Sequence, residues 1–418
     1  MGAGLTVDHN SAGQGRGPLA YRGYRALWLI GLGRNFGTWM HNMAAAAALA
    51  TLSPSPLVNS LLYATTMVPI FFFSFPAGLF ADRFGRGFIL FWSSAVSILA
   101  AAGFLALDLT GGLTVGWLLG LTFAINTSWA VTYPAWNAEV SAALPRELVK
   151  DGASLNSLSY NLARTMGPAI AGFVYSGFGG APVYLLNALS FVGLLAYFFG
   201  HRSTDRSAGA TLTVPDAFRQ TIALVRESVL FRAVLIRGFL YFFVGQTIWS
   251  MLPVYVMRER GLSESQMGFA SASAGVGAIA MALLYPRLRR RYEDNWILLG
   301  AGVITAACTA VLPALTTVPQ MAVPLAVYGA VYAVAVTINN GLIQVHVPID
   351  MRARAVGLYV VVLYGVQSAG SVVAGWLAGL WGYGWAFGGL GAALLCCSVL
   401  GVLRWPVTEP QVTHQVRS

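Results

Sequence analysis

The sequence predicts an all-α integral membrane protein with twelve transmembrane helices arranged in two six-helix, pseudo-symmetric halves. Three observations support this fold class. Of the 418 residues, 57% are hydrophobic and 10% are charged, whereas soluble domains carry about 25% charged residues. The apolar residues gather in runs of about 20, which is enough for a helix to cross a bilayer core of roughly 30 Å. In addition, part of the second half of the chain repeats part of the first.

The apolar runs are interpreted as helices because open strands would leave unpaired backbone groups in lipid. Polar or turn-forming residues separate each run from the next. Twelve spans are predicted, at 26–49, 57–76, 87–107, 113–137, 152–176, 181–200, 233–256, 266–285, 296–314, 319–342, 355–380 and 384–404.

Basic residues orient these spans, because Lys and Arg collect in cytoplasmic loops. With a cytoplasmic N-terminus, each loop from an even-numbered to an odd-numbered span is basic, from Arg83 and Arg86 in the first to Arg352 in the last. The opposite face carries only Arg258 and Arg260. We therefore expect a multi-pass protein of the inner (plasma) membrane with both termini in the cytoplasm. The net charge of +10 then reflects this asymmetry rather than nucleic-acid binding.

A polar segment at 201–231 divides the spans into two sets of six. An internal repeat supports the division, since 151–179 aligns with 354–382 at a constant offset of 203. The expected organisation is a cytoplasmic N-terminal tail at 1–25, a first half at 26–200, a cytoplasmic linker at 201–231, a second half at 232–405 and a cytoplasmic tail at 406–418.

Polar residues inside apolar spans are candidate functional residues, because an arginine at a helix centre costs about 2.5–3.5 kcal/mol on insertion scales. Arg34, Thr38 and His41 share one face of the first span, a pattern suited to a water-filled cavity and a titratable group. Alternatively, Arg34 extends to the interface and His41 only bonds a neighbour. Arg164 lies mid-span, one turn after Tyr160, where a cavity role competes with a structural pair.

The fourth span carries Asn126, Trp129, Tyr133 and Asn137 on one continuous face. Amide and aromatic groups in a row suit a large amphipathic ligand, although Tyr and Trp near span ends are also common interface anchors. Glu139, near the cytoplasmic end, could receive a proton or pair with a surface arginine. The second half offers counterparts for a shared substrate or coupling site: Gln246, Trp249, Asn340, Gln344 and Gln367.

Two segments have sequences suited to gating. Residues 77–86 are expected to form a short charged turn at the membrane surface, in which Asp82 could pair across the half-domain and hold an outward-open form. In the fifth span, a proline would bend the helix and small residues would let a neighbour approach. The gating candidates are Gly78, Asp82, Arg83, Gly85 and Arg86 in the turn, and Gly167, Pro168 and Gly172 in the span.

These motifs resemble those of a known family. Gly78, Asp82, Arg83, Gly85 and Arg86 are similar to the loop between helices 2 and 3 of the major facilitator superfamily of secondary transporters. Further matches resemble its bacterial drug-efflux and siderophore-export branch, the transmembrane secretion effector type. They are Leu27-Trp28, the segments 34–39, 144–148 and 154–157, and 161–172, whose Gly167-Pro168 pair with Gly172 resembles the fifth-helix motif of antiporters.

The resemblance covers essentially the whole chain and implies the major facilitator fold with a substrate site between the halves. Members often carry an acid where Thr38 stands, so a proton would have to be carried by Glu139, Asp82 or His41. The implied function is export of a small amphipathic molecule (a drug, secondary metabolite or siderophore) by alternating access with proton antiport. The alternatives are a transporter-fold sensor or assembly partner without turnover, and a nutrient or metal carrier.

The expected partners are the small-molecule substrate, a proton and the lipid bilayer, with no nucleic acid, and a monomer is expected. The sequence contains no Ser/His/Asp set or paired carboxylates, so no enzyme activity is predicted. Cys308, Cys396 and Cys397 fall inside apolar spans without metal-ligand spacing. No metal site or cofactor is therefore expected.

Overall fold

The computed structural model describes residues 17–200, 219, 223, 225–347 and 351–407. These residues are helical, and no strand occurs among them. In chain order the helices are η1 (Pro18–Ala20), α1 (Arg22–Leu52), α2 (Pro56–Phe84), α3 (Arg86–Leu109), α4 (Val115–Ala142), η2 (Arg146–Leu148), α5 (Val149–Phe178), α6 (Ala181–Gly200), α8 (Val229–Gly245), α9 (Thr247–Val254), η3 (Tyr255–Glu259), α10 (Glu264–Arg289), α11 (Asp294–Val311), η4 (Leu312–Ala314), α12 (Val318–His346) and α13 (Arg352–Arg404).

Nine helical stretches within these ranges are long and apolar enough to cross a membrane. One runs from Val229 to Glu259 through α8, α9 and η3, and another spans 355–404 within α13. The helices α1 and α5 are equally long but are not among the nine; each has an arginine in its interior, Arg34 and Arg164 respectively. The prediction of an all-helical membrane protein is therefore confirmed.

The helices extend beyond the predicted apolar spans, and one predicted turn is wrong. The helix α2 was expected to end at residue 76 but continues to Phe84, and α3 begins at Arg86. Of the predicted turn at 77–86, only Gly85 leaves the helical conformation, with φ 87° and ψ 142°. The length of the apolar run does not predict the end of α2, because helical hydrogen bonds join backbone groups and do not require apolar side chains.

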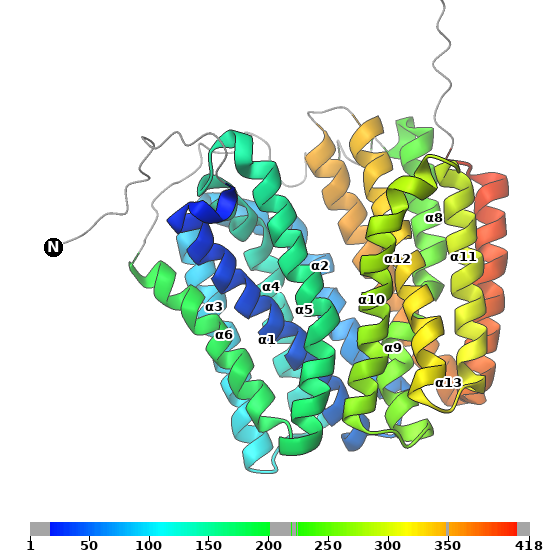
Figure 1. Cartoon of the computed structure of the whole chain (residues 1–418), viewed down its shortest axis with the longest axis horizontal. Helices are drawn as coiled ribbons and strands as arrows, with labels where there is room; N and C mark the ends of the chain where they lie inside the picture. Colours follow the sequence, from blue (N-terminus) through cyan, green and yellow to red (C-terminus); the bar gives the residue numbers. More distant parts are fainter. Residues whose placement is uncertain (1–16, 201–218, 220–222, 224, 348–350, 408–418) are drawn as a thin grey trace, which may run out of the picture.

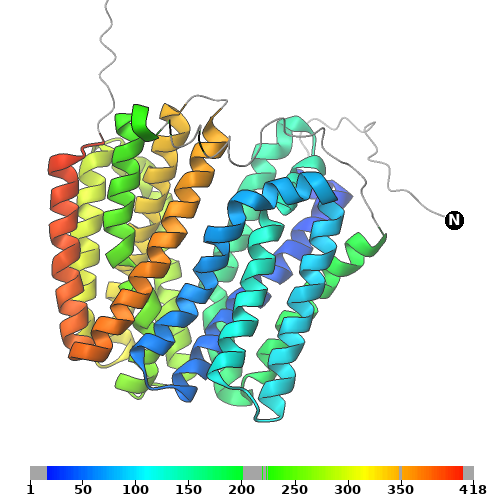
Figure 2. The ribbon, with the colours of Figure 1, turned by 180° about the vertical axis from the view of Figure 1, so that it is seen from behind.

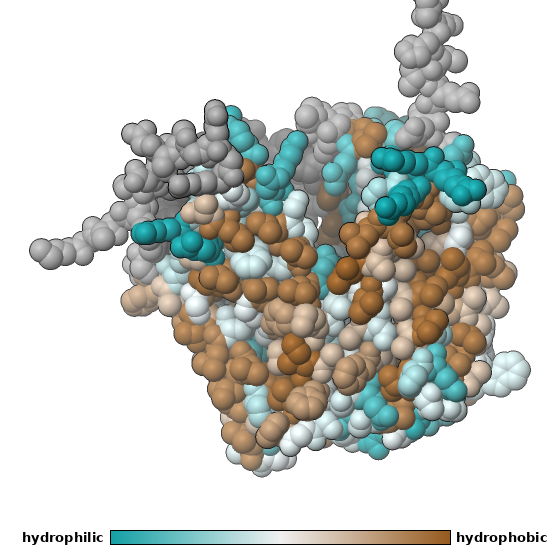
Figure 3. All heavy atoms as spheres, in the orientation of Figure 1, coloured by the Kyte–Doolittle hydropathy of each residue, from teal (hydrophilic) through white to brown (hydrophobic). Residues whose placement is uncertain are grey.

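The helices lie in two groups, α1 to α6 and α8 to α13 (Figures 1 and 2). They meet mainly through α5 against α10 and α2 against α13. Both views show the groups diverging toward the end at which α1 and α5 begin. The space-filling surface is hollowed between the groups at that end, and hydrophobic residues cover much of the outer face in view (Figure 3).

The internal repeat has matching structural positions. Gly179 and Gly382, which are 203 residues apart, both have φ 77°, a value that favours glycine because it has no Cβ. Other repeat-related glycines lie at helix contacts that leave no room for a side chain. Gly167 faces Trp39 and Met40 of α1 where Gly370 faces Phe243 of α8, and Gly172 faces Glu264 and Gly268 of α10 where Gly375 faces Pro56 and Ser60 of α2.

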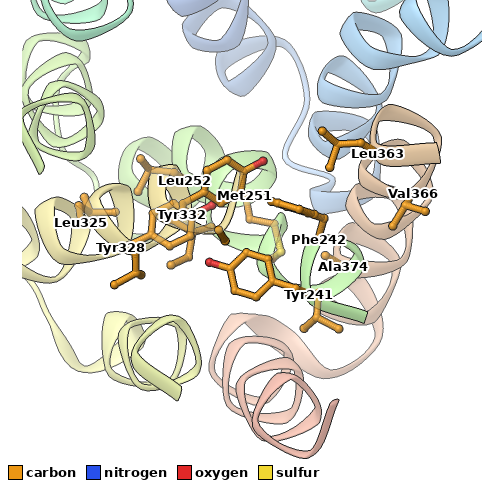
Figure 4. Close-up of a cluster of buried hydrophobic side chains, with 14 of the residues drawn as sticks. Tyr241, Phe242, Met251, Leu252, Leu325, Tyr328, Tyr332, Leu363, Val366 and Ala374 are labelled. Carbon is orange, nitrogen blue, oxygen red and sulfur yellow. The ribbon is translucent and has the colours of Figure 1, made fainter. Parts of the chain in front are cut away.

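The largest buried cluster includes residues from α8, α9, α12 and α13, and its side chains converge between these helices (Figure 4). It is rich in tyrosine, with Tyr241 packed edge-on against Phe242 and both close to Tyr332. Three of its hydroxyls have a partner: Tyr241 bonds Thr305, Tyr328 donates to the carbonyl of Gly245, and Tyr332 donates to Gln246. The buried hydroxyls of Tyr184 and Tyr359 have none.

The contact between α10 and α12 depends on two glycines. A Cβ at Gly329 would collide with the carbonyl oxygen of Ala274, and one at Gly277 would collide with that of Ala326. Both obstacles are backbone atoms, so a rotamer change cannot relieve them. Helices in lipid associate through such close approaches, because the hydrophobic effect does not distinguish a neighbouring helix from lipid tails.

Replacement of Gly329 by alanine should therefore destabilise the protein, by about 1–3 kcal/mol if it behaves as other overpacked sites do. The matched control is Gly341→Ala in the same helix, where no heavy atom lies within 4 Å of the position a Cβ would take. There, the better helix propensity of alanine should leave stability unchanged or slightly higher. Thermal unfolding of the purified protein in detergent measures both. Equal midpoints for the two variants would contradict the packing argument.

Candidate functional site

Arg164 of α5 lies where the two helix groups meet. Its guanidinium carbon is 5.9 Å from the ring centre of Trp39 in α1 and 5.4 Å from that of Trp249 in α9. A cation at this distance over an aromatic face is attracted to the ring, so each group contributes one aromatic contact. The Nε atom is buried and has no hydrogen-bond partner. The structure thus brings together two of the predicted site residues, Arg164 and Trp249.

Tyrosines from both groups surround this arginine. Arg164 interacts electrostatically with Tyr63 of α2, Tyr160 of its own helix, Tyr332 of α12 and Tyr364 of α13. Tyr160 also packs edge-on against Trp39, with ring centres 5.8 Å apart. Among the described residues no aspartate or glutamate pairs with Arg164, and the ion pair between Arg289 and Asp294 lies elsewhere, at the junction of α10 and α11. The arginine charge is thus held by aromatic rings rather than by a counter-ion.

Two glutamines complete the site. The Tyr63 hydroxyl donates to Oε1 of Gln367 at 3.3 Å, which joins α2 to α13. The Tyr332 hydroxyl donates to Oε1 of Gln246, also at 3.3 Å, while the buried Nε2 of Gln246 has no partner. Each amide oxygen therefore accepts one hydrogen bond, and an N–H donor without a partner remains at Gln246. The predicted counterparts Gln246, Trp249 and Gln367 contact Tyr332, Tyr328 and Tyr63 respectively.

The predicted row on α1 lies elsewhere. Arg34 is buried, with its guanidinium carbon 4.6 Å from the ring of Trp136 in α4. His41 is fully buried between Phe104 of α3 and Tyr184 of α6, at ring distances of 4.6 and 5.6 Å. The hydroxyl of Thr38 is buried without a partner. This face therefore packs against α3, α4 and α6 inside the α1–α6 group. A different face of α1 packs against α5.

That second face of α1 carries Asn35, whose Nδ2 donates to Ser159 of α5 at 3.1 Å, and Trp39 beside Arg164. Both were within reach of sequence reasoning, since Asn35 is adjacent to Arg34 and Trp39 follows one helical turn later. A single sequence does not show which face of a polar helix will point toward the second group.

The α4 row changes from buried to exposed along the helix. Asn126 is buried and bonds the carbonyl of Thr122, Trp129 is half-buried against Tyr133 at 5.2 Å, and Tyr133 and Asn137 are exposed. Exposure thus increases toward the end where the groups diverge. In α12, Asn340 is half-buried and Gln344 is exposed. Glu139 is half-buried and interacts electrostatically with Tyr197 of α6.

Among the gating candidates, Gly85 and Arg86 form the α2–α3 junction. The surroundings of Gly78 and the side chains of Asp82 and Arg83 lie outside the part that the structure describes. The pairing predicted for Asp82 therefore stays a prediction. Gly167 and Pro168 lie side by side in α5 with different neighbours. Gly167 faces α1, whereas the carbonyl of Pro168 and the Cα of Gly172 touch Gly268 of α10.

One residue that sequence reasoning missed is Arg237 of α8. It is buried and donates to the side-chain and backbone oxygens of Asn295 in α11. The repeat could have found it, because the offset of 203 carries Arg34 onto Arg237. Each helix group therefore has a buried arginine in its first long helix. Tyr63 and Tyr332 were also missed, because isolated tyrosines in apolar spans are commonly read as interface anchors.

Comparisons with known proteins identify related transporters. A family model described as transmembrane secretion effector matches residues 14–416. The multidrug efflux pump Tap of Mycobacterium tuberculosis is 27% identical over 368 residues, covering 82% of this chain and 84% of that protein. An uncharacterised MFS-type transporter of Bacillus subtilis, YfiS, is 23% identical over 397 residues, covering 90% and 89%.

Solved structures of low sequence identity share the fold. An auto-inhibited peptide transporter of the POT family has a TM-score of 0.73 at 12% identity, covering 95% of this chain and 99% of that one. A bacterial homologue of the human lysosomal transporter Spinster, in an inward-facing and unoccupied conformation, has a TM-score of 0.66 at 16% identity, covering 94% and 97%.

Because the family model matches nearly the entire length, the chain belongs to the transmembrane secretion effector family of the major facilitator superfamily, and it is a membrane transporter rather than an enzyme.

Proposed function

We propose that this protein exports small amphipathic organic molecules, such as drugs, secondary metabolites or siderophores, across the inner membrane by alternating access coupled to proton antiport. The observation that carries the proposal is a site to which both helix groups contribute side chains. Arg164, Trp39 and Trp249 come from α5, α1 and α9. A ligand held there touches both groups, so their relative motion would open it to one side or the other.

The proposed architecture is twelve spans in two halves, 26–200 and 232–405, joined by a cytoplasmic linker at 201–231 between tails at 1–25 and 406–418. Counting α8, α9 and η3 as one span and α13 as two, divided at Gly382, supports this number. The concentration of arginine on one side supports cytoplasmic termini. The form described here would then be open to the cytoplasm, and we expect it to function as a monomer.

The cargo class rests on the lining of the site and on the relatives. Aromatic rings and amides around one cation suit an amphipathic compound, and the relative Tap is named a multidrug efflux pump. Glu139 is our first candidate for the proton carrier, with Asp82 and His41 behind it. A sensor without turnover and a nutrient or metal carrier remain the competing functions. No group of three or more metal-ligating side chains occurs in the described ranges to favour the metal carrier.

The first test is substrate-dependent proton movement in inside-out vesicles. Addition of an exported dye or antibiotic should collapse a preset pH gradient, and Glu139→Gln should abolish this response while leaving substrate counterflow intact, because only the coupling step needs the titratable group. The matched control is Glu147→Gln in the exposed segment before α5. Counterflow and coupling lost together, or neither lost, would remove Glu139 as the carrier. No transport of any tested compound by well-folded protein would favour the sensor.

Alternating access also requires a contact that holds the two helix groups together at the end opposite to the one where they diverge. Our candidate for this contact is Arg258 in the π-helical turn η3. Its Nε and a terminal nitrogen donate to the carbonyls of Ala50 and Thr51, the last turn of α1. A cation at a helix C-terminus interacts favourably with the unpaired carbonyls. Arg260, two residues later, bonds Tyr255 and the carbonyl of Pro313 within its own group.

We therefore expect Arg258→Ala to shift the population toward the form open at that end, and Arg260→Ala to leave it unchanged. Hydrogen bonds to charged groups contribute about 1.5–3 kcal/mol, enough for a shift of tenfold or more. The reporter is a cysteine at Ser60, which is fully buried against Gly375 of α13, in a background with the native cysteines replaced. A membrane-impermeant maleimide should label it several-fold faster in Arg258→Ala. Equal rates in both variants would exclude a role in closure.

A further inference from the structure

We infer that the cargo is an aromatic anion, and that its negative group binds at Arg164 while its rings pack against the aromatic side chains around that arginine. This inference rests on the proposed export function and specifies its substrate class. It is drawn from the charge and hydrogen-bonding balance of the site, which differs from that of Arg34, Arg237, Arg258 and Arg260.

Three other arginines of the described helices already have hydrogen-bond partners. Arg237 bonds Asn295, Arg258 bonds the end of α1, and Arg260 bonds Tyr255 and Pro313. Arg34 also lacks a hydrogen bond, but it is sealed inside the α1–α6 group against Trp136, with 5% of its surface exposed. Arg164 differs from all four, because it is half-buried at the junction of the groups and makes no hydrogen bond or ion pair with any described residue.

A cation in this position is costly without a partner, since removing a charge from water is compensated only by pairing or hydrogen bonding. The two tryptophan faces compensate part of the cost. They leave the N–H groups, which project in the plane of the guanidinium, available for a ligand. A carboxylate, phenolate or sulfonate matches this fork and supplies the missing negative charge.

The neighbouring polar groups are also donors. The amide oxygens of Gln246 and Gln367 already accept from Tyr332 and Tyr63, at 3.3 Å each. The Nε2 of Gln246 is buried without an acceptor. Tyr160 and Tyr364 have no hydrogen bond with any described residue, so their hydroxyls can donate to a ligand. Together with the Arg164 charge, these free donors favour a ligand rich in acceptors over an ammonium group, which brings a second positive charge and only donors.

The aromatic part of the cargo follows from the walls of the site. Trp39 and Tyr160 pack edge-on on one side of Arg164, and Trp249 lies on the other beside Tyr328. On α4, Trp129 and the exposed Tyr133 extend the aromatic lining toward the open end. Offset or edge-on ring contacts would hold a flat ligand whose anionic group reaches Arg164.

The test uses fluorescein and rhodamine 123, which share a xanthene scaffold but carry negative and positive charge. Fluorescence polarisation with the purified protein in detergent should show tighter binding of fluorescein. Arg164→Ala should weaken fluorescein binding about tenfold or more, as expected for loss of one charge-assisted hydrogen bond, without weakening rhodamine 123. The matched control is Arg291→Ala, which removes the same charge from an exposed position after α10.

Tyr160→Phe and Tyr364→Phe test the same site if Arg164→Ala fails to fold, because each removes only a single hydroxyl. Both should weaken fluorescein selectively. Tighter binding of rhodamine 123, or fluorescein binding that is indifferent to Arg164, would overturn the inference.

Transport of the same dyes in proteoliposomes separates this inference from the proposed function. Arg164-dependent binding of fluorescein without its movement under a pH gradient would refute export and keep the site assignment. Gradient-driven movement of rhodamine 123, equal in wild type and Arg164→Ala, would keep export and refute the anionic cargo.

Discussion

Close approach of helix backbones is the constraint on which this structure depends. In a bilayer, apolar side chains gain little by leaving lipid for a neighbouring helix, so packing and directed polar contacts must hold the helices together. Here close approaches occur at glycines, among them Gly172 against Gly268, Gly375 against Ser60, and Gly329 against Ala274. The first two join the helix groups, and the third lies within one group. Since an interface without interlocked side chains can be remade in another register, such contacts are compatible with the rocking that alternating access requires.

Among the described residues, three polar features between the groups have a definable consequence. Arg258 binds the last carbonyls of α1 and ties the groups together at one end. Tyr63 bonds Gln367 near the middle. Arg164 lies at the same level but bonds no described residue, and is held only by Trp39 and Trp249. The first two contacts stabilise the conformation described here, whereas the third leaves a charge whose partner a transported molecule would supply.

The internal repeat differs at the candidate site. At the offset of 203, glycines fall on glycines, and Gly179 and Gly382 share the same backbone conformation. At the centre the equivalence is lost, because Arg164 corresponds to Gln367 and Trp129 to Tyr332. Glycines that set helix approach are thus repeated, whereas the residues that we propose for ligand contact differ between the two repeats. Two identical halves would have placed two like charges in one site, and their repulsion would be costly at low dielectric.

The sequence by itself determined that this protein is helical, where most of its spans lie and which residues are too polar for lipid, because hydropathy and the energetic cost of a buried charge are properties of the chain alone. It also located Arg164, Gln246, Trp249 and Gln367. Only the tertiary structure decided how these residues combine. Arg34, Thr38 and His41 lie on one helix face, as their spacing predicts, but that face turns inside its own group. Periodicity specifies which residues share a face, whereas the direction of that face depends on how the neighbouring helices pack. The partners of Arg164 come from α1, α2, α9, α12 and α13, a convergence set by the contacts of distant helices and not by any local pattern.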